Sequence, residues 1–291
     1  MHPNLEFPSI FYIEPTNDCN LSCIMCPRRK ITRKIGYMSF ELFRKVVDQL
    51  FGRKIAALSL HLFGEPLLHP DIVDMVKYAK SKGLPNVRFA TNATALNDSL
   101  ISGLIASELD SLTVSMDFSI VKRYCPAVKD EYSMNLDNNI LKLIKLKDKA
   151  SLKKPKVYMQ IIDMLSTHNL LDNFVKKWEG VADKVVISKE MSWADDGSVS
   201  QEKNSSTRAI CINQLTQGVV QWNGNVTSCC TSADNFTDNN EFLGNVTNES
   251  LKEIFQGKKR KRLIGEQLNG NYDLVPSCKQ CSDRGRYVYI P

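Results

Sequence analysis

Three cysteines lie within eight residues near the start of the chain, at Cys19, Cys23 and Cys26. Thiolates at this spacing can bind one iron–sulfur cluster, and no fourth Cys or His lies nearby in the sequence. Three ligands on a [4Fe–4S] cluster leave one iron open to bind another molecule. A structural zinc site normally closes with four ligands in two pairs, so the spacing favours the iron–sulfur cluster.

Four further cysteines in the last third of the chain could form a second metal site. They are Cys211, Cys229 and the closely spaced Cys278 and Cys281. Two groups of ligands are typical both of a zinc ribbon and of an iron–sulfur site, and spacing alone favours neither. Of the two cysteines that remain, Cys125 is interpreted as a small buried residue.

The other remaining cysteine, Cys230, belongs to a predicted hairpin. Asn223-Gly224 is typical of a two-residue type I′ turn, and this turn would put Cys229 opposite Gly218. The strands expected on either side of the turn are residues 218–222 and 225–230. Successive strand residues point to opposite faces, so Cys230 would point away from a metal bound by Cys229. Cys230 is then either apolar filler or a free thiol near the active site.

The composition, with 43% apolar and 24% charged residues among 291, is that of a globular protein. This length allows one large α/β domain or a large domain with a small appendage. No apolar run is long enough to cross a membrane, and the first residues lack the layout of a signal peptide, so we expect a cytoplasmic location. Because thiols stay reduced there, metal binding or catalysis explains a chain with nine cysteines better than disulfides do.

The net charge of +6 comes largely from two basic runs, residues 28–34 and 258–262. We interpret such runs first as solvated faces of helices or loops. They could also contact a phosphorylated substrate or an acidic electron-donor protein such as flavodoxin or ferredoxin. Neither run has interleaved aromatic residues for base stacking, so nucleic acid is not an expected partner.

Six short β-rich runs alternate with amphipathic helical stretches between residue 9 and about residue 190. Ser39 is expected to cap the first helix and Gly83 to end the second. The repeated order of strand and helix predicts parallel strands, and six units are too few for an eight-fold barrel. We therefore expect an α/β fold, either a partial (β/α)6 barrel or an open wound sheet. The expected strands are Ile10–Glu14, Ala57–Leu62, Val87–Thr91, Leu112–Met116, Val157–Ile162 and Val185–Ile187.

In either fold, the loops at the C-terminal ends of the strands carry the chemistry. The first of these loops, residues 15–29, contains the three closely spaced cysteines. The alternating pattern ends after Lys189, and a polar stretch to about Arg208 predicts a linker. We therefore expect a barrel in residues 1–190, a linker in 191–210 and a small C-terminal module in 211–291.

The cysteine loop resembles the signature of the radical S-adenosylmethionine (SAM) superfamily. In that family, the amino and carboxylate groups of SAM chelate the open iron of the cluster. An electron from the cluster then cleaves SAM, and the 5′-deoxyadenosyl radical abstracts a hydrogen atom from the substrate. The sequence departs from the usual pattern at Met25, where the family usually has an aromatic residue near adenine. The resemblance implies a partial barrel that binds SAM at Cys19, Cys23 and Cys26.

Further stretches resemble family motifs in the expected order. Gly64-Glu65-Pro66 is similar to the Gly-Gly-Glu motif, which implies that Glu65 binds the SAM amino group, although Phe63 replaces the first glycine. Asn92 after the third strand, and Ser115 and Asp117 at the fourth, resemble positions that contact the carboxylate and ribose of SAM.

The C-terminal module resembles the auxiliary-cluster domain of the SPASM/twitch subgroup. A full SPASM domain would continue past the last cysteine pair with further ligands, whereas this chain continues with Tyr287 and Val288. The shorter twitch version is the better match. It implies one auxiliary [4Fe–4S] cluster bound by Cys211, Cys229, Cys278 and Cys281.

The resemblance leaves the reaction outcome open. In an epimerisation, a thiol returns hydrogen to the opposite face of the substrate radical, and we favour this outcome because Cys230 has no other evident task. In an oxidation, the radical loses an electron to the auxiliary cluster, and Gly64 to Leu68 resembles the motif of a radical SAM dehydrogenase that acts on an amino-cyclitol. An amino sugar or cyclitol is the preferred substrate, with a ribosomal peptide as the alternative. A non-catalytic iron–sulfur or zinc protein is the alternative from a different class.

Overall fold

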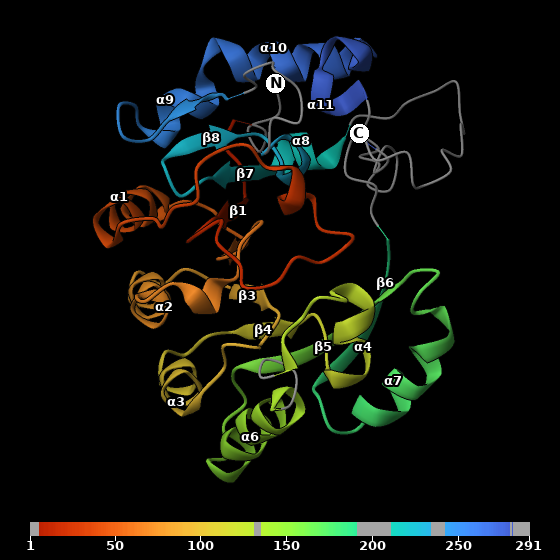
Figure 1. The fold of residues 1–291 in the computed structure, drawn as a ribbon. Helices are drawn as coiled ribbons and strands as arrows, with labels where there is room; N and C mark the ends of the chain where they lie inside the picture. Colours follow the sequence, from red (N-terminus) through yellow and green to blue (C-terminus); the bar gives the residue numbers. More distant parts are fainter. Residues whose placement is uncertain (1–5, 131–134, 191–210, 234–241, 280, 282–291) are drawn as a thin grey trace.

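The computed structural model describes residues 6–130, 135–190, 211–233, 242–279 and 281. These residues build one nine-stranded sheet in the order β6-β5-β4-β3-β2-β1-β7-β8-β9 (Figure 1). Strands β1 to β6 are parallel neighbours in chain order, which confirms the predicted α/β class with six parallel units. The strands are β1 Ile10–Ile13, β2 Ala57–Ser59, β3 Val87–Thr91, β4 Ser111–Val114, β5 Lys156–Asp163, β6 Lys184–Lys189, β7 Gln217–Val220, β8 Asn225–Thr227 and β9 Gly244–Asn245.

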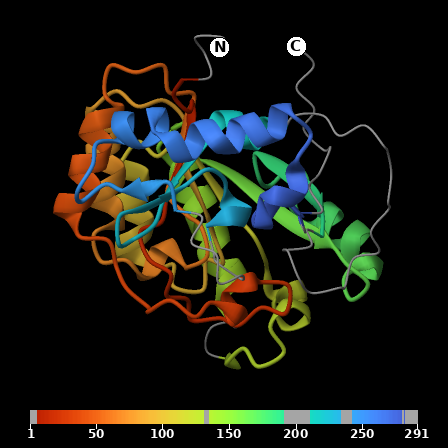
Figure 2. The ribbon, with the colours of Figure 1, turned by 90° about the horizontal axis from the view of Figure 1, so that it is seen from above.

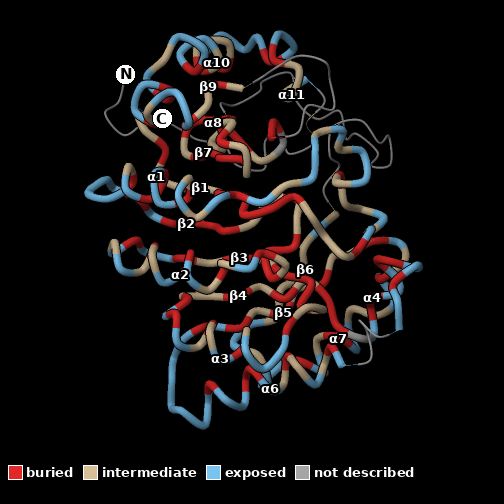
Figure 3. Tube along the Cα trace, turned by 60° about the vertical axis from the view of Figure 1, so that its left-hand side comes forward, coloured by how far each residue is buried: buried red, intermediate tan, exposed pale blue. Residues whose placement is uncertain are grey.

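The helices that follow β1, β2 and β3, and the longer of the two helices after β4, lie along one side of the sheet (Figure 1). Their outward turns are exposed, whereas the strands behind them are largely buried (Figure 3). Ser39 caps α1 as predicted, because its side chain accepts a hydrogen bond from the Leu42 backbone nitrogen at 3.1 Å. Gly83 follows α2 with a φ of +71°, a conformation that suits glycine at a helix end. The helices are α1 Phe40–Leu50, α2 Ile72–Ser81, α3 Asp98–Ala106, α4 Phe118–Tyr124, α6 Leu136–Lys149 and α7 Leu171–Trp178.

The C-terminal segment extends the same sheet. β7 pairs in parallel with β1, with Tyr12 beside Val219. The C-terminal helices lie over this end of the sheet (Figure 2), and the Phe255 ring meets Phe11 of β1 edge-to-face at 5.6 Å between centroids. The expected barrel and C-terminal module therefore share a sheet and a core, while their division at residues 190 and 211 stays a prediction. The helices are α8 Ile212–Thr216, α9 Leu251–Gln256, α10 Lys258–Leu268 and α11 Pro276–Lys279.

The hairpin between β7 and β8 differs from the prediction. Thr227 lies opposite Val219, and the Gln221 backbone nitrogen donates to Asn225, so the loop has three residues, 222–224. Only Gly224 has a positive φ in this loop, at +86°, as in a turn followed by a bulge rather than a type I′ turn. The predicted register, with Cys229 opposite Gly218, is therefore wrong by one residue.

Contacts of Trp222 explain the longer loop. The Trp222 backbone nitrogen donates to Glu14 at 3.3 Å. Its ring packs so closely over Gly36 that a Cβ on that glycine would lie 2.4 Å from the ring. These tertiary contacts hold Trp222 out of the strand ladder.

The predicted linker, residues 191–210, lies outside the described residues. Within the described part of the chain, no helix is both long enough and apolar enough to cross a membrane.

Candidate active site

The three-cysteine loop leaves the C-terminal end of β1 and is held by the end of α4. The Ile24 backbone nitrogen donates to the Tyr124 carbonyl oxygen at 2.8 Å. The Ser22 backbone nitrogen donates to the Cys125 sulfur at 3.4 Å. Cys125 is buried, as predicted, and it has the additional role of a hydrogen-bond acceptor for this loop.

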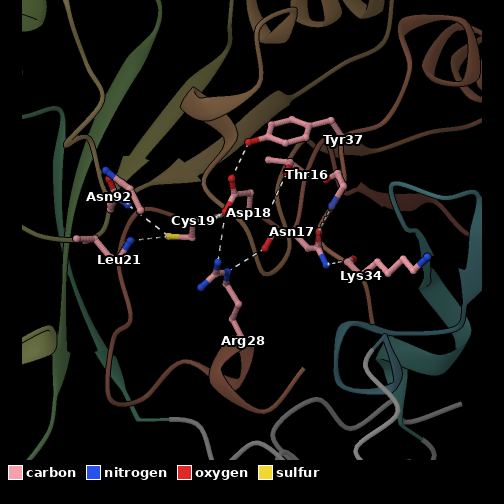
Figure 4. A network of polar contacts seen from close by, with 11 residues as sticks. Thr16, Asn17, Asp18, Cys19, Leu21, Arg28, Lys34, Tyr37 and Asn92 are labelled. Atoms are coloured by element: carbon pink, nitrogen blue, oxygen red, sulfur yellow. Dashed lines mark hydrogen bonds and ion pairs between the residues drawn. The ribbon is translucent and has the colours of Figure 1, made fainter. Parts of the chain in front are cut away.

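Asp18 fixes the backbone directly before Cys19 (Figure 4). Its Oδ1 accepts from the Cys19 backbone nitrogen at 2.8 Å, and its Oδ2 accepts from the Tyr37 hydroxyl at 2.7 Å. Arg28, two residues after the last cysteine of the loop, contacts Asp18 at 3.4 Å and donates to the Asn17 carbonyl at 2.9 Å. The two ends of the cysteine loop are therefore tied together by one polar network.

The two basic runs are not uniformly solvated. Arg33 forms two hydrogen bonds with the fully buried Glu14, at 2.7 and 2.5 Å. Arg260 is also buried and donates to the carbonyls of Leu215 and Phe255 at 3.0 and 3.3 Å. Interpreting both runs as solvated faces is therefore wrong for these two arginines, because buried carboxylate and carbonyl oxygens hold their guanidinium groups.

The environment of the loop opposes free thiolates. Burial, together with the nearby Glu65 carboxylate, raises the pKa of Cys19 to about 12. Burial also raises the pKa of Cys23 above its usual range, and the neighbouring thiols of Cys26 and Cys19 act in the same direction. Thiolates at this position therefore need a positively charged partner, which the iron of a cluster would supply.

The donor set fits an iron–sulfur cluster by its chemistry. Cys19, Cys23 and Cys26 are all half-buried and come from one anchored loop. No three His, Cys, Asp or Glu side chains in the described ranges are already drawn together as a closed metal site. The fit of this loop to an iron–sulfur cluster therefore rests on its three soft sulfur ligands, on their closeness in one loop and on their partial burial.

Gly64 and Glu65 lie against the cysteine loop. The Glu65 backbone nitrogen donates to the Asp18 carbonyl at 2.7 Å. A Cβ on Gly64 would lie 2.1 Å from the Thr16 carbonyl oxygen, so only glycine allows this approach. The predicted Gly-Glu motif therefore lies beside the predicted cluster loop.

The Glu65 carboxylate is buried but well supplied with hydrogen-bond donors. Oε1 accepts from the Thr91 hydroxyl at 2.6 Å and the Leu67 backbone nitrogen at 3.0 Å. Oε2 accepts from the Asn92 backbone nitrogen at 2.7 Å, which leaves it capacity for one more donor. Burial raises the pKa of Glu65 to about 7, although these hydrogen bonds act to lower it.

Asn92 links β3 to the cysteine loop. Its Nδ2 donates to Asn20 at 3.1 Å and contacts the Cys19 sulfur at 3.7 Å. Its Oδ1 accepts from the Thr94 hydroxyl at 2.6 Å. Ser115 lies at the end of the neighbouring strand β4, and its hydroxyl donates to the Thr91 carbonyl at 3.0 Å.

Asp117 has a structural task that accounts for its hydrogen bonds. It is fully buried, and Oδ1 accepts from the Ser119 backbone nitrogen at 2.8 Å as the N-cap of α4. Oδ2 accepts from Lys177 at 2.7 Å and from the Trp178 indole at 2.8 Å. A contact of Asp117 with the ribose of SAM stays a prediction.

The second cysteine set gathers around two buried glutamines. The Gln214 amide nitrogen lies 3.6 Å from the Cys229 sulfur and 3.7 Å from the Cys278 sulfur. Gln267 of α10 donates to the same Cys278 sulfur at 3.1 Å and accepts from the Cys211 backbone nitrogen at 3.3 Å. Three of the four predicted ligands thus meet at these two side chains.

Cys281 is joined to the second set through its backbone. Its nitrogen donates to the Cys278 carbonyl oxygen at 3.4 Å. The set contains only soft sulfur ligands, and these come from several separate segments, so its chemistry fits an auxiliary cluster.

The environment of Cys230 differs from the prediction. β8 ends at Thr227, and Cys230 begins the 3-10 turn Cys230–Ser232, with Cys229 as the residue that caps it. The argument that Cys229 and Cys230 lie on opposite faces of one strand is therefore wrong. Cys230 is half-buried, whereas Cys229 is buried.

Sequence reasoning missed Asp18, Gln214 and Gln267. Asp18 directly precedes the first cysteine, so its position in the sequence could have indicated a role in fixing the loop. The two glutamines gave no such signal, because they reach the sulfur atoms only through the packing of α8 and α10.

Comparisons with known families agree with this site. Residues 13–166 match the model of the radical SAM superfamily. Residues 211–282 match SPASM, an iron–sulfur cluster-binding domain. The first match spans more than half of the chain. Together the two matches confirm the predicted cofactor types, which are a SAM-cleaving [4Fe–4S] cluster, an auxiliary cluster and SAM itself.

Two relatives that align over most of their own length have different names. The chain is 24% identical to a tungsten-containing aldehyde ferredoxin oxidoreductase cofactor-modifying protein of Pyrococcus furiosus, over 96% of this chain and 88% of the relative. It is 27% identical to a probable GTP 3′,8-cyclase of Methanothermobacter marburgensis, over 90% of this chain and 97% of the relative.

Solved structures share the fold at low identity. BtrN in complex with AdoMet and 2-DOIA has a TM-score of 0.60 at 16% identity and covers 97% of this chain and 99% of its own. SuiB of Streptococcus suis bound to SAM has a TM-score of 0.67 at 13% identity, over 89% of this chain and 68% of its own. At these identities, the similarity shows a shared fold. The cysteine loop, the adjoining Gly64-Glu65 motif and the family match lead to one conclusion: this chain belongs to the radical SAM superfamily.

Proposed function

We propose that this chain is a radical SAM dehydrogenase that oxidises a small polar molecule, an amino sugar or cyclitol. The observation that carries this proposal is the second cysteine set. Gln214 holds the sulfur atoms of Cys229 and Cys278 around one buried amide. A site for which the protein offers four sulfur ligands supports a cluster that exchanges electrons rather than one that binds substrate.

We assign the first cluster to Cys19, Cys23 and Cys26 and the second to Cys211, Cys229, Cys278 and Cys281. When bound, the first cluster would supply the electron that cleaves SAM into methionine and the hydrogen-abstracting radical. The second would accept the electron that the substrate radical gives up as it loses a proton to a base.

The chain's own residues would hold SAM in place. Glu65 accepts a hydrogen bond from the SAM amino group through the remaining capacity of Oε2. Asn92 and Ser115 lie at the adjoining strand ends, and we assign them to the carboxylate and ribose of SAM. Asp117 keeps the start of α4 in position through its cap to Ser119.

Epimerisation is the second candidate outcome. It requires a protonated thiol that reaches the substrate radical, and the half-buried Cys230, next to the proposed ligand Cys229, is the candidate donor. The strand geometry that was expected to turn Cys230 away from the metal is absent, so oxidation becomes the first choice. The similarity to BtrN, whose complex contains AdoMet and 2-DOIA, supports a small cyclic substrate.

The exposed basic residues of α10 support an acidic electron donor such as flavodoxin or ferredoxin as the partner that reduces the protein. Apart from the buried Arg260, residues 258–262 are exposed. A surface of positive charge attracts an acidic protein and speeds its association.

Mass spectrometry of candidate substrates turned over in D2O tests the reaction. Anaerobically reconstituted protein is given SAM, reductant and a panel of amino sugars, cyclitols and short peptides. Oxidation predicts a product lighter by two mass units, with one 5′-deoxyadenosine formed per product. A product heavier by one mass unit at constant oxidation state would establish epimerisation instead, and its loss in Cys230→Ala would identify the donor.

A further inference from the structure

Two buried glutamine side chains contact the sulfur atoms of the second cysteine set. Gln214 and Gln267 are only 3% and 2% exposed. Between them they direct amide nitrogens at the sulfurs of Cys229 and Cys278, at distances of 3.1 to 3.7 Å. Cysteine thiolates that bind iron can only accept hydrogen bonds, so the amide nitrogens suit the sulfur atoms.

Stability alone does not explain Gln214. Its Oε1 is buried and has no hydrogen-bond partner in the described part of the chain. A buried polar atom without a partner is unfavourable, and an apolar side chain of the same size would avoid this cost. Among the residues that the structure describes, Gln217 and Gln221 also have a buried Oε1 without a partner, and what distinguishes Gln214 from them is that its amide nitrogen contacts sulfur atoms.

We propose that Gln214 and Gln267 raise the reduction potential of the auxiliary cluster through N–H···S hydrogen bonds to its ligands. Reduction adds negative charge that is shared with the sulfur atoms, and a donor aimed at them stabilises the reduced form. The inference rests on the proposed ligand set, Cys211, Cys229, Cys278 and Cys281. The two glutamines are positioning residues, because they act through the ligands and touch no substrate.

The test compares single variants of the full chain after anaerobic reconstitution. Gln214→Met and Gln267→Met keep an unbranched side chain of similar length but remove the donor. Gln217→Met is the matched control, because Gln217 is also a buried glutamine and its amide nitrogen donates to Asn213 instead of a sulfur. Each variant is analysed for iron and titrated with reductant while the electron paramagnetic resonance (EPR) signal of each cluster is recorded.

The expected result is a more negative potential of the auxiliary cluster in Gln214→Met and Gln267→Met. The potential of the Cys19/Cys23/Cys26 cluster should stay unchanged in the same samples, and Gln217→Met should match the wild type. An unchanged auxiliary potential in a variant with full iron content would overturn the inference. Failure of both variants to load iron would also overturn it, since the glutamines would then act in assembly.

The number of clusters in the wild-type protein shows whether a negative result concerns the glutamines or the proposed ligands. Wild-type protein with only one cluster would contradict the ligand assignment itself. Two clusters in the wild type, with no change of potential in the variants, would contradict only the role of the glutamines.

Discussion

The two cysteine sets are built in different ways. Cys19, Cys23 and Cys26 lie on one short loop, which the chain holds by backbone contacts to α4 and to Gly64-Glu65. Cys211, Cys229 and Cys278 come from segments far apart in the sequence, and they meet because β7 pairs with β1 and because Gln214 and Gln267 bridge them.

The first site is thus built by residues close together in the sequence, whereas the second is built by the packing of distant segments. In the proposed assignment, the first set leaves an iron open for SAM, so its loop must be fixed tightly against the residues that hold SAM. In the same assignment, the protein supplies all four ligands of the second cluster, so the properties of that cluster depend on the side chains packed around the sulfur atoms.

The largest expected effect is the loss of iron when one cysteine of either set is replaced. Cys23→Ala and Cys278→Ala should each lower the iron content from about eight to about four atoms per chain. Adding SAM should change the EPR signal of the cluster that remains in Cys278→Ala, and should not change the one that remains in Cys23→Ala. Zinc in the second site, or loss of all iron in both variants, would break the comparison.

A smaller effect, on the free energy of unfolding, is expected when one glycine beside each cysteine set is replaced by alanine. Gly64→Ala should lower the free energy of unfolding by about 3 kcal/mol, because its Cβ would overlap the Thr16 carbonyl oxygen. Gly265→Ala is the control in α10, where a Cβ meets nothing within 4 Å, and it should stabilise the helix by about 0.5–1 kcal/mol. Chemical denaturation measures both. Equal effects would contradict the close packing at Gly64.

The smallest expected effect is a pH dependence of SAM binding beside the first cysteine set. Burial raises the pKa of Glu65 to about 7, so its carboxylate is mostly ionised at pH 8 and mostly protonated at pH 6. The ionised form is the better acceptor for the SAM amino group, so the Kd for SAM should be about tenfold higher at pH 6 than at pH 8. Titration calorimetry at both values provides the measurement. Glu65→Ala should bind SAM weakly at both, and a Kd in the wild type that is independent of pH would remove Glu65 from the SAM site.

Local patterns predicted the barrel well. The β-rich runs predicted six parallel strands in chain order, and the apolar spacing predicted α1. The strand expected at Val87–Thr91 has the same bounds as β3. The cysteine spacing and the Gly64-Glu65 motif indicated the first site for the same reason: their chemistry is carried by residues close together in the sequence.

The hairpin and the second site depended on contacts that a local pattern does not contain. Asn223-Gly224 suits two kinds of turn, and the choice between them follows from the packing of Trp222 on Gly36. Likewise, nothing near Gln214 in the sequence indicates that Cys278 will lie beside it. Asp117 was assigned to SAM from its motif, whereas its observed contacts are a helix cap and an ion pair with Lys177.

We assign SAM cleavage to the cluster bound by the three-cysteine loop and not to the auxiliary cluster. The most direct test of this assignment is the amount of 5′-deoxyadenosine formed when SAM and reductant are added to reconstituted wild type, Cys23→Ala and Cys278→Ala. We expect 5′-deoxyadenosine from the wild type and from Cys278→Ala, and none above background from Cys23→Ala. Formation of 5′-deoxyadenosine by Cys23→Ala, or its absence from the wild type, would show that SAM is not cleaved at the Cys19/Cys23/Cys26 site.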